Sequence, residues 1–364
     1  MNSQSHNFSL IKGNEAIAKG ALAARCQCYF AYPITPQSDI PEYLSGELPR
    51  QGGEFIQAES EIGAINMLLG AAACGKRAMT SSSSPGISLK QEGISYLAGS
   101  ELPGVIVNIT RGSPGLGSID PSQGDYYQAT RGGGHGDYRM LVLAPSTCQE
   151  AYDLTIRAFD LAFAYRNPVM ILGDAILGQM KEPVLERRET ADTSQEAVEW
   201  ALSGAKGRPR RLIKSLYLAD GALAEHNDRL QAKYGEMHKE QDWEEFATED
   251  SQVLVVAFGS VGRIAKSAIR MLRSQGYRVG LFRPVTLFPF PSERLRELAE
   301  NNSLITIENN AGQMVDDVRL AVRNYSDSAF YGIMPGKLPS PEDLLPPILD
   351  VWEQNSQRAQ AAER

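Results

Sequence analysis

Short apolar runs alternate along the chain with longer segments in which apolar residues recur every three or four positions. The runs that predict β-strands lie at 29–31, 55–57, 77–80, 105–109, 141–143 and 169–172. The segments with helical periodicity lie between them, at 13–26, 39–48, 61–73, 85–99 and 149–164. Val105–Ile109 has the character of a strand that is buried on both faces of a parallel sheet. Residues 10–185 are therefore predicted to form a doubly wound parallel α/β domain.

The alternation is lost over 186–250 and returns after it. Gln231–Asp250 has seven acidic and two basic residues, so 186–250 is interpreted as a helical or irregular connector. Beyond it, strands are predicted at 253–257, 278–282 and 303–307, and helices at 261–275, 291–300 and 313–324. This pattern predicts a second, smaller α/β domain over 251–345. Residues 346–364 are expected to be a polar tail that is frayed from Trp352 onward.

Two carboxylates stand where a predicted strand meets a predicted helix. Glu59 and Glu61 flank Ser60, and Ile65 and Leu68 then mark the buried face of a helix that is rich in small residues. Acidic residues and a serine at this point complement the positive end and the free N–H groups of a helix. On this segment alone that structural explanation is favoured, because acidic first turns are common. The rest of the sequence favours a chemical role for Glu61.

Four of the predicted strands end in polar sequence, at 32–36, 59–61, 81–86 and 110–111. Ligands collect at the carboxyl ends of parallel strands, so these segments are expected to meet at one edge of the sheet. They would bring together the Thr35 hydroxyl, the Glu61 carboxyl, a serine-rich loop and the Arg111 guanidinium. Arg111 suits a small carboxylate, which its planar fork binds through two parallel hydrogen bonds. A structural salt bridge to Asp120 or Asp125 is an equal alternative.

Gly112–Asp137 is a long, glycine-rich segment with little periodicity. Loops of this length are usually functional or disordered, and Tyr126 and Tyr138 argue for order. His135, within a run of glycines, is interpreted as a loop histidine rather than as a base. Neither a Ser–His–Asp order nor the spacing of a metal site emerges, so no metal ligand is predicted.

Composition narrows the class of protein. The formal charge is −8 over 364 residues and no basic cluster dominates, which argues against nucleic acid. No apolar run approaches the ~18 residues of a membrane helix, and Met1–Ser9 lacks the pattern of a signal sequence, so a cytoplasmic protein is predicted. The spacing of the cysteines does not match an iron–sulfur site, which leaves the chain without an electron carrier; they are Cys26, Cys28, Cys74 and Cys148.

Several motifs together resemble those of the 2-oxoacid:ferredoxin oxidoreductases. They occur in the same order and separation, at 32–36, 60–64, 110–111, 281–291 and 308–314. Within that family, Met79–Gly93 is most similar to the alpha chain of the branched-chain, 2-oxoisovalerate type, with the 2-oxoglutarate type a close second. The resemblance implies a pyrimidine-binding domain of the thiamine-enzyme type over 10–185 and a domain similar to the transketolase C-terminal domain over 251–345.

The resemblance also implies a reaction and a set of site residues. Enzymes of this family use thiamine diphosphate and coenzyme A to convert a 2-oxoacid into acyl-CoA and carbon dioxide, with electrons passed to ferredoxin. By position, Glu61 would hydrogen-bond the pyrimidine nitrogen of the cofactor, beside Pro33 and Ile34. Thr35 and Arg111 would hold the keto and carboxylate oxygens of the substrate and orient it for attack.

Neighbouring residues receive secondary roles from the same resemblance. Ser83 and Ser84 are expected to line the pocket, and the Gly112–Asp137 loop is expected to form part of the site for the substrate side chain. Apolar Ile62 and Ile65 are expected to shield the Glu61 carboxyl from water.

The parts that are missing from this chain predict its partners. Thiamine enzymes anchor the diphosphate through Mg²⁺, with a Gly-Asp-Gly motif and an Asn-Asn pair further along. Gly173–Ala175 lacks the second glycine, and Asn301–Asn302 stands too far from it. A beta chain is therefore expected to bring the diphosphate site and Mg²⁺, and a gamma or ferredoxin-like delta chain the iron–sulfur clusters. Two alternatives remain: a non-oxidative thiamine enzyme, and a non-catalytic subunit that keeps the fold.

Overall fold

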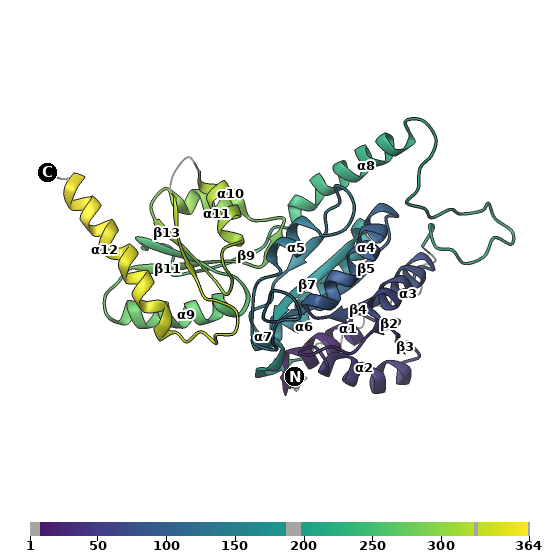
Figure 1. Ribbon diagram of the computed structural model, residues 1–364, viewed down its shortest axis with the longest axis horizontal. Helices are drawn as coiled ribbons and strands as arrows, with labels where there is room; N and C mark the ends of the chain where they lie inside the picture. The colour runs from purple at the N-terminus through teal and green to yellow at the C-terminus, as the bar shows by residue number, and fades with distance from the viewer. Residues whose placement is uncertain (1–7, 187–197, 324–326, 363–364) are drawn as a thin grey trace, which may run out of the picture.

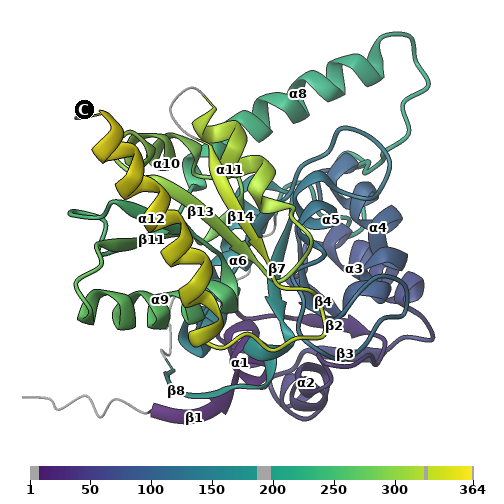
Figure 2. The same cartoon turned by 60° about the vertical axis from the view of Figure 1, so that its left-hand side comes forward.

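Two sheets, each enclosed by helices, organise the chain in the computed structural model, which describes residues 8–186, 198–323 and 327–362 (Figure 1). The larger sheet has seven strands and the smaller has five. A separate two-stranded ribbon pairs β1 (Phe8–Lys12) with β8 (Lys181–Leu185) in antiparallel register, and it is seen beside the larger sheet in Figure 2. The predicted α/β class is confirmed.

The larger sheet has the strand order β12-β6-β7-β5-β4-β2-β3, in which every strand except β12 at the edge is parallel to its neighbours. Its strands are β2 (Cys28–Ala31), β3 (Glu54–Gln57), β4 (Ala78–Ser82), β5 (Gly104–Thr110), β6 (Leu141–Leu143), β7 (Pro168–Asp174) and β12 (Thr286–Phe288). The central strands β4, β5 and β7 are buried along their whole length, which explains why apolar or small residues predominate in them.

Helices cover both faces of this sheet (Figure 1). α3 (Glu61–Ala73) and α4 (Ser84–Gly99) pack against each other over one face. α1 (Gly13–Ala23) and α6 (Cys148–Tyr165) pack against each other on the other face, next to α2 (Asp39–Arg50). The connections α5 (Tyr126–Arg131) and α7 (Ala175–Gln179) are short.

The smaller sheet has the order β14-β13-β10-β11-β9, with β9 antiparallel at one edge. Its strands are β9 (Trp243–Phe246), β10 (Val253–Val256), β11 (Val279–Pro284), β13 (Ser303–Glu308) and β14 (Ser328–Gly332). The helices around it are α9 (Gly259–Ser274), α10 (Ser292–Ala299), α11 (Met314–Val322) and α12 (Leu345–Ala362). Apolar side chains of α9 and α12 share one core with alternate residues of β10, and α10 packs on α11.

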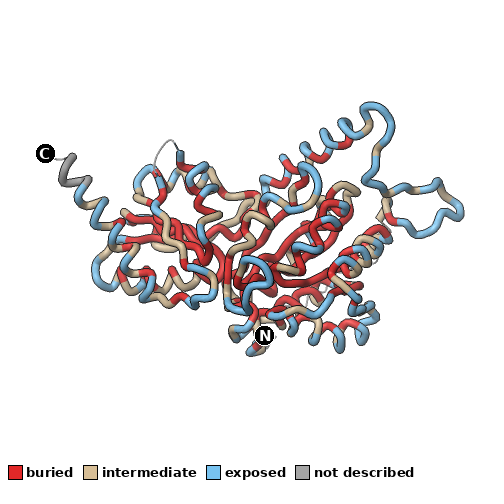
Figure 3. Tube along the Cα trace, in the orientation of Figure 1, coloured by how far each residue is buried: buried red, intermediate tan, exposed pale blue. Residues whose placement is uncertain are grey.

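The two bodies are joined by a strand that crosses between them and by a pair of salt bridges. β12 follows directly after β11 of the smaller sheet, yet it pairs with β6 at the edge of the larger one. Arg283 on β11 is 2% exposed and bridges the bodies, since its Nη2 lies 2.5 Å from Glu150 on α6 and its Nε 2.6 Å from Glu244 on β9. α8 (Ala222–Glu236) and the segment before it lie on the outside of the molecule and are largely exposed (Figure 3).

Several local predictions are wrong, each for a physical reason. Ser81 and Ser82 belong to β4 rather than to a loop, because the Ser81 hydroxyl finds buried partners in Tyr29, at 2.5 Å, and Gln37. The acidic stretch before Asp250 contains β9, whose half-buried side chains pair with the smaller sheet. The expected frayed tail is helical through Ala362, since the Trp352 ring packs on Tyr277 and Asn355 Nδ2 donates to the Gln252 carbonyl at 3.3 Å.

Other predictions hold. Cys26 and Cys28 are both buried, and burial raises the pKa of the Cys26 thiol to about 12, as expected of unreactive cysteines. Within the described ranges, no helix is both long and apolar enough to cross a membrane.

Candidate active site

The polar strand ends meet at one edge of the larger sheet, as the sequence predicts. β5, β4, β2 and β3 are consecutive neighbours and run parallel, so the segments that follow them lie side by side. Contacts between these segments then place Glu61, Arg111 and Thr35 around one region. The site is thus made by the order of four strands rather than by one local motif.

Glu61 is the first residue of α3, but it is not the cap of that helix. Ser60 performs that role, because its hydroxyl accepts a hydrogen bond of 3.0 Å from the Gly63 N–H. The Glu61 side chain is 7% exposed, and among the described residues no group donates a hydrogen bond to its carboxylate. A buried carboxylate without donors is an acceptor held ready for a ligand, since such groups are normally satisfied.

The Glu61 carboxyl lies against the first turn of α4. A methyl group at Gly86 would stand 2.8 Å from Glu61 Oε1 and would overlap the Ser82 hydroxyl. Only glycine allows this approach, which explains the Pro-Gly step at the start of α4. The hydroxyls of Ser82 and Ser83 are also buried here without a hydrogen-bond partner.

Arg111 is held in the same region by backbone carbonyls. It is 8% exposed, its Nη1 donates to the Thr35 carbonyl at 2.9 Å, and its Nη2 donates to the Leu116 carbonyl at 3.0 Å. Its Nε is buried and has no partner. Its two hydrogen-bond partners are neutral carbonyls, so neither of them offsets the positive charge of the guanidinium.

The alternative of a salt bridge to Asp120 or Asp125 is wrong within the described residues. Asp125 accepts a hydrogen bond of 2.8 Å from Asn108, and burial raises the pKa of this carboxyl. Asp120 accepts one of 2.7 Å from Ser118. Both carboxylates are therefore engaged away from Arg111.

Ser84 belongs to the support of the site. Its Oγ accepts the Arg111 N–H at 3.1 Å, and its own N–H donates to Asn108 Oδ1 at 3.1 Å. Ser84 fixes the start of α4 to the end of β5, whereas Ser83 keeps a free buried hydroxyl.

The turn after β2 presents Thr35 next to Arg111. Asn14 Nδ2 and Gln179 Nε2 donate to the Pro36 carbonyl, at 2.8 and 3.2 Å, and so anchor the turn to the body. Thr35 and Pro33 are exposed in this turn and Ile34 is half-buried. The turn thus leaves its side chains accessible beside the guanidinium.

The apolar surroundings of Glu61 differ from the expectation in one respect. Ala64 and Ile65 are buried below it, but Ile62 is 50% exposed, because it lies on the outward side of α3. Tyr32, in the turn after β2, is 39% exposed. One side of the site is therefore open and partly apolar.

The glycine-rich loop is ordered by the smaller body. The Tyr127 N–H donates to Gln313 Oε1, and Gln313 Nε2 donates to the Gly124 carbonyl, both at 2.7 Å. Asn310 Nδ2 donates to the Gln123 carbonyl at 2.9 Å. The motif at 308–314 thus positions the loop whose earlier part touches Arg111 through the Leu116 carbonyl.

His135 lies elsewhere. It lines a cavity of about 510 Å³ together with Ser95 and Gly99, near the end of α4, and with His226 of α8. Glu61 contacts the beginning of α4, so His135 lies at the opposite end of that helix from Glu61. His135 is a loop residue, as the sequence predicts.

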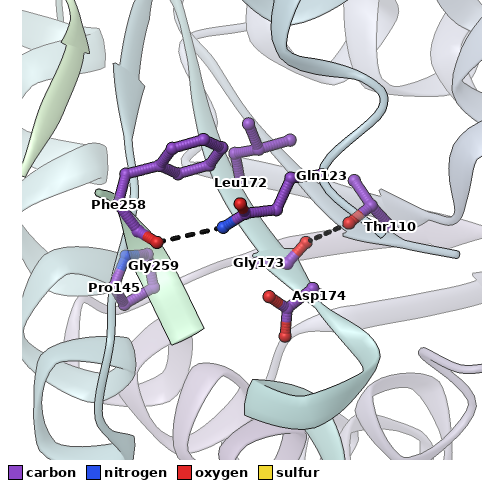
Figure 4. Close-up of a pocket in the computed structure, with 8 residues that line it drawn as sticks. All are labelled: Thr110, Gln123, Pro145, Leu172, Gly173, Asp174, Phe258 and Gly259. Atoms are coloured by element: carbon purple, nitrogen blue, oxygen red, sulfur yellow. Dashed lines mark hydrogen bonds between the residues drawn. The ribbon is translucent and has the colours of Figure 1, made fainter. Parts of the chain in front are cut away.

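A second, small cavity lies between the two bodies and offers no room for a cofactor (Figure 4). Its volume is about 10 Å³, enough for a single water at most. Gln123 crosses it and donates to the Phe258 carbonyl at 3.0 Å. Asp174, the acid of the incomplete Gly-Asp-Gly motif, caps Leu177 at 3.0 Å and also accepts from Ser260. In the described part of the chain, no cluster of three histidines, cysteines or carboxylates could hold a metal.

Two residues of the region were missed by sequence reasoning. Asn108 is a polar residue inside the apolar run of β5, and that interruption was a usable signal. Lys90 stands among buried positions of α4 and is itself fully buried. A lysine inside a helical pattern gives no sign of burial, because most lysines are exposed.

The site as a whole joins a free carboxylate to a guanidinium with a spare N–H. The carboxylate of Glu61 can accept a hydrogen bond from a protonated ring nitrogen, and the free N–H of Arg111 can donate one to a carboxylate.

Comparisons with known proteins agree with this chemistry. Residues 19–249 match the family model for pyruvate flavodoxin/ferredoxin oxidoreductase, thiamine diP-binding, and residues 251–344 match pyruvate:ferredoxin oxidoreductase core domain II. The ketoisovalerate oxidoreductase subunit VorB of Methanothermobacter thermautotrophicus is 49% identical, over 94% of this chain and 97% of the relative. The 2-oxoglutarate synthase subunit KorA of the same organism is 36% identical, over 94% and 98%.

Solved structures show the same fold. A 2-oxoglutarate:ferredoxin oxidoreductase from Magnetococcus marinus superimposes with a TM-score of 0.83 and 24% identity, covering 96% of this chain and 66% of that one. A split gene transketolase has a TM-score of 0.59 and 15% identity, covering 95% and 99%.

Proposed function

Because this chain belongs to the pyruvate flavodoxin/ferredoxin oxidoreductase family, we propose that it is the subunit of a 2-oxoacid:ferredoxin oxidoreductase that holds the aminopyrimidine of thiamine diphosphate. The reaction converts a 2-oxoacid and coenzyme A into acyl-CoA and carbon dioxide, and two electrons pass to ferredoxin. Residues 10–185 are assigned to the pyrimidine-binding domain, 186–250 to the connector and 251–345 to the domain similar to that of transketolase.

One observation carries the proposal: a buried carboxylate without a donor stands in the same site as a guanidinium with a spare N–H. Glu61 matches the need of an aminopyrimidine for a carboxylate partner at its ring nitrogen. Gly86 leaves room for that carboxyl at the start of α4. Arg111 Nε is a free buried donor, which matches the carboxylate common to all 2-oxoacids.

Each residue then has a defined task. The cofactor, when bound, supplies a carbon nucleophile that adds to the keto group of the substrate. Glu61 accepts a hydrogen bond from the pyrimidine nitrogen and shares its proton, with Pro33 and Ile34 beside the ring. Arg111 holds the substrate carboxylate, and Thr35 donates its hydroxyl to the keto oxygen. Together they fix the substrate in one orientation, which lowers the entropic cost of the addition.

The substrate is proposed to be branched-chain 2-oxoisovalerate. The 49% identity to a ketoisovalerate oxidoreductase subunit supports it over the 36% identity to a 2-oxoglutarate synthase subunit. Leu116, whose carbonyl holds Arg111, is 78% exposed, and Ile119 is 65% exposed. These apolar side chains suit an isopropyl group, whereas the second carboxylate of 2-oxoglutarate would require a further cation.

Partner chains are proposed to complete the enzyme. A beta subunit would cover the open side of the site, where Ile62 and Tyr32 are exposed, and would bring the diphosphate site with Mg²⁺. Gamma or ferredoxin-like delta subunits would carry the iron–sulfur clusters that pass electrons to ferredoxin. Such covering would also desolvate Glu61 on the side that Ile62 leaves open.

The test is to purify the chain alone and with its partner subunits, and to measure reduction of a viologen dye that depends on both coenzyme A and a 2-oxoacid. The assembled enzyme is expected to be active with 2-oxoisovalerate and less active with 2-oxoglutarate, pyruvate and indolepyruvate. Activity of the isolated chain would contradict the proposed division of roles. Activity without an electron acceptor would instead indicate a non-oxidative thiamine enzyme.

A non-catalytic subunit is distinguished by a second variant. Titration of the assembled complex with thiamine diphosphate should fail after Glu61→Ala. Unchanged binding and activity in that variant would show that this chain serves only as a scaffold.

A further inference from the structure

One face of α4 carries Gly86, Lys90 and Gly93, which are spaced by four and three residues and so lie in one row along the helix. Glycine at both ends of the row lets α3 come very close. A methyl group at Gly86 would stand 2.8 Å from Glu61 Oε1, and one at Gly93 would stand 2.6 Å from Ile65 Cγ1. Lys90 is therefore enclosed between two tight contacts of α4 with α3.

Lys90 is fully buried at this position. Its Nζ donates a hydrogen bond of 3.0 Å to the Thr80 hydroxyl on β4, below the helix. An ammonium has three N–H donors, and this hydroxyl is a neutral partner. A buried cation with so little compensation costs stability, and an apolar side chain of the same length would fill the space at lower cost.

The direction of the side chain links Lys90 to the site. Long side chains on a helix point back toward its N-terminus, so the Lys90 ammonium is directed toward the turn that contains Gly86. Glu61 lies against that turn. Thr80, the hydrogen-bond partner of Lys90, is two residues before Ser82, whose hydroxyl also borders Gly86.

Glu61 is the charged group that acts on Lys90. Burial lowers the pKa of Lys90 to about 8, and the charge of Glu61 acts in the opposite direction. From β4, the Thr80 hydroxyl accepts a hydrogen bond from Lys90 Nζ, and this partner carries no charge. Asp125, a half-buried carboxyl near the start of α4, is engaged by the side chains of Asn108 and Ser84.

We propose that Lys90 is a positioning residue of this site, whose buried ammonium keeps Glu61 ionised so that the proton shared with the pyrimidine nitrogen stays on the ring. The part that concerns the ring rests on the proposed function. The placement of Lys90 near Glu61, one helical turn from the Gly86 position that Glu61 contacts, belongs to the chain itself and does not depend on any cofactor. A positive charge near a carboxylate favours the ionised form of the carboxylate.

The first experiment uses the full chain without cofactor. Urea unfolding is measured between pH 4 and 8 for the natural chain, Lys90→Met, Glu61→Gln and the double variant. The contribution of Glu61 is the difference between each chain and its Glu61→Gln counterpart. In Lys90→Met the pH midpoint of that contribution is expected to rise by about one unit or more. An unchanged midpoint would overturn the proposal.

The second experiment uses the enzyme assembled with its partner subunits and saturated with thiamine diphosphate. In Lys90→Met, the acid limb of the pH profile of kcat is expected to move to higher pH by about one unit, with about tenfold lower kcat on that limb. KM for the 2-oxoacid should remain within about twofold, since Arg111 is untouched. Equal loss at every pH would indicate a merely structural role and would overturn the proposal.

Lys233 supplies the matched control. It is a half-buried lysine on α8 that pairs with Glu101 at 3.3 Å, beyond the C-terminal end of α4 and far along that helix from Gly86. Lys233→Met is expected to leave the pH profile in place. If the natural enzyme failed to bind thiamine diphosphate, the proposed function would fall, while the experiment on the chain without cofactor would still decide whether the charge of Lys90 acts on Glu61.

Discussion

Replacing Lys90 with methionine is expected to stabilise the folded chain near neutral pH, although the residue is fully buried. Burial lowers the pKa of Lys90 from 10.5 to about 8. A pKa change of this size means that binding the Lys90 proton is about 3 kcal/mol less favourable in the folded state than in the unfolded chain. Because the unfolded chain binds more protons between pH 8 and 10.5, this destabilisation is present below pH 8 and disappears as the pH rises through that window.

Methionine fills the same space without a charge, but it leaves the Thr80 hydroxyl without its partner. That loss costs about 1 kcal/mol, so the net gain near pH 7 is about 2 kcal/mol. The loss at Thr80 does not depend on pH. The difference in stability between Lys90→Met and the natural chain is therefore expected to shrink by about 3 kcal/mol between pH 7 and 10.5.

Urea unfolding followed by circular dichroism at several pH values measures this difference, with midpoints and slopes compared for both chains. Lys206→Met provides a control, because Lys206 is exposed in the segment before α8. A constant difference between Lys90→Met and the natural chain from pH 7 to 10.5 would refute the reasoning. Such a result would mean that the folded chain does not hold Lys90 as a buried, protonated ammonium.

The remaining predictions concern three other positions. Gly86→Ala should lower the unfolding free energy by about 1–3 kcal/mol and impair thiamine diphosphate binding, because its methyl group meets Glu61; titration calorimetry of the assembled enzyme checks this. Arg111→Lys should raise KM for the 2-oxoacid about 10- to 100-fold and leave KM for coenzyme A unchanged, and equal changes in both would contradict it. Arg283→Met should lower the unfolding free energy by about 3 kcal/mol in urea titrations, since it leaves Glu150 and Glu244 without their cation.

The pattern of the sequence predicted the strands of the larger sheet except β12, and it predicted that their polar ends would meet. Strand ends are informative, because an apolar run that stops at Thr110-Arg111 or at Glu61 leaves polar groups at one edge of a parallel sheet. Parallel neighbouring strands end at the same edge of the sheet. The sequence could therefore predict that Arg111 and Thr35 lie close together, as they do.

The nature of that contact was not predictable. Arg111 donates to backbone carbonyls of Thr35 and Leu116, and main-chain partners leave no mark on residue types. The outward direction of Ile62 was missed for a different reason. Helical periodicity identifies an apolar stripe, but Ile62 stands at the margin of that stripe and is 50% exposed.

The contacts between the two bodies could not be predicted from the sequence either. The strand β12 follows a strand of the smaller sheet but pairs with the larger one, and no local pattern encodes that choice. Gln313 and Asn310 position the glycine-rich loop from far along the chain. The family resemblance singled out the motif that contains them, and the structure supplies its physical task.

The most direct test of the account compares Glu61→Gln with Glu59→Gln in the assembled enzyme. Glu59 is an exposed carboxylate two residues earlier, so it matches the change in charge outside the site. Thiamine diphosphate binding and turnover with 2-oxoisovalerate are measured for both. Glu61→Gln is expected to lower kcat by about 100-fold or more with little change in folding, and Glu59→Gln by less than about twofold. Equal and small effects of the two substitutions would contradict the assignment of Glu61 as the partner of the pyrimidine.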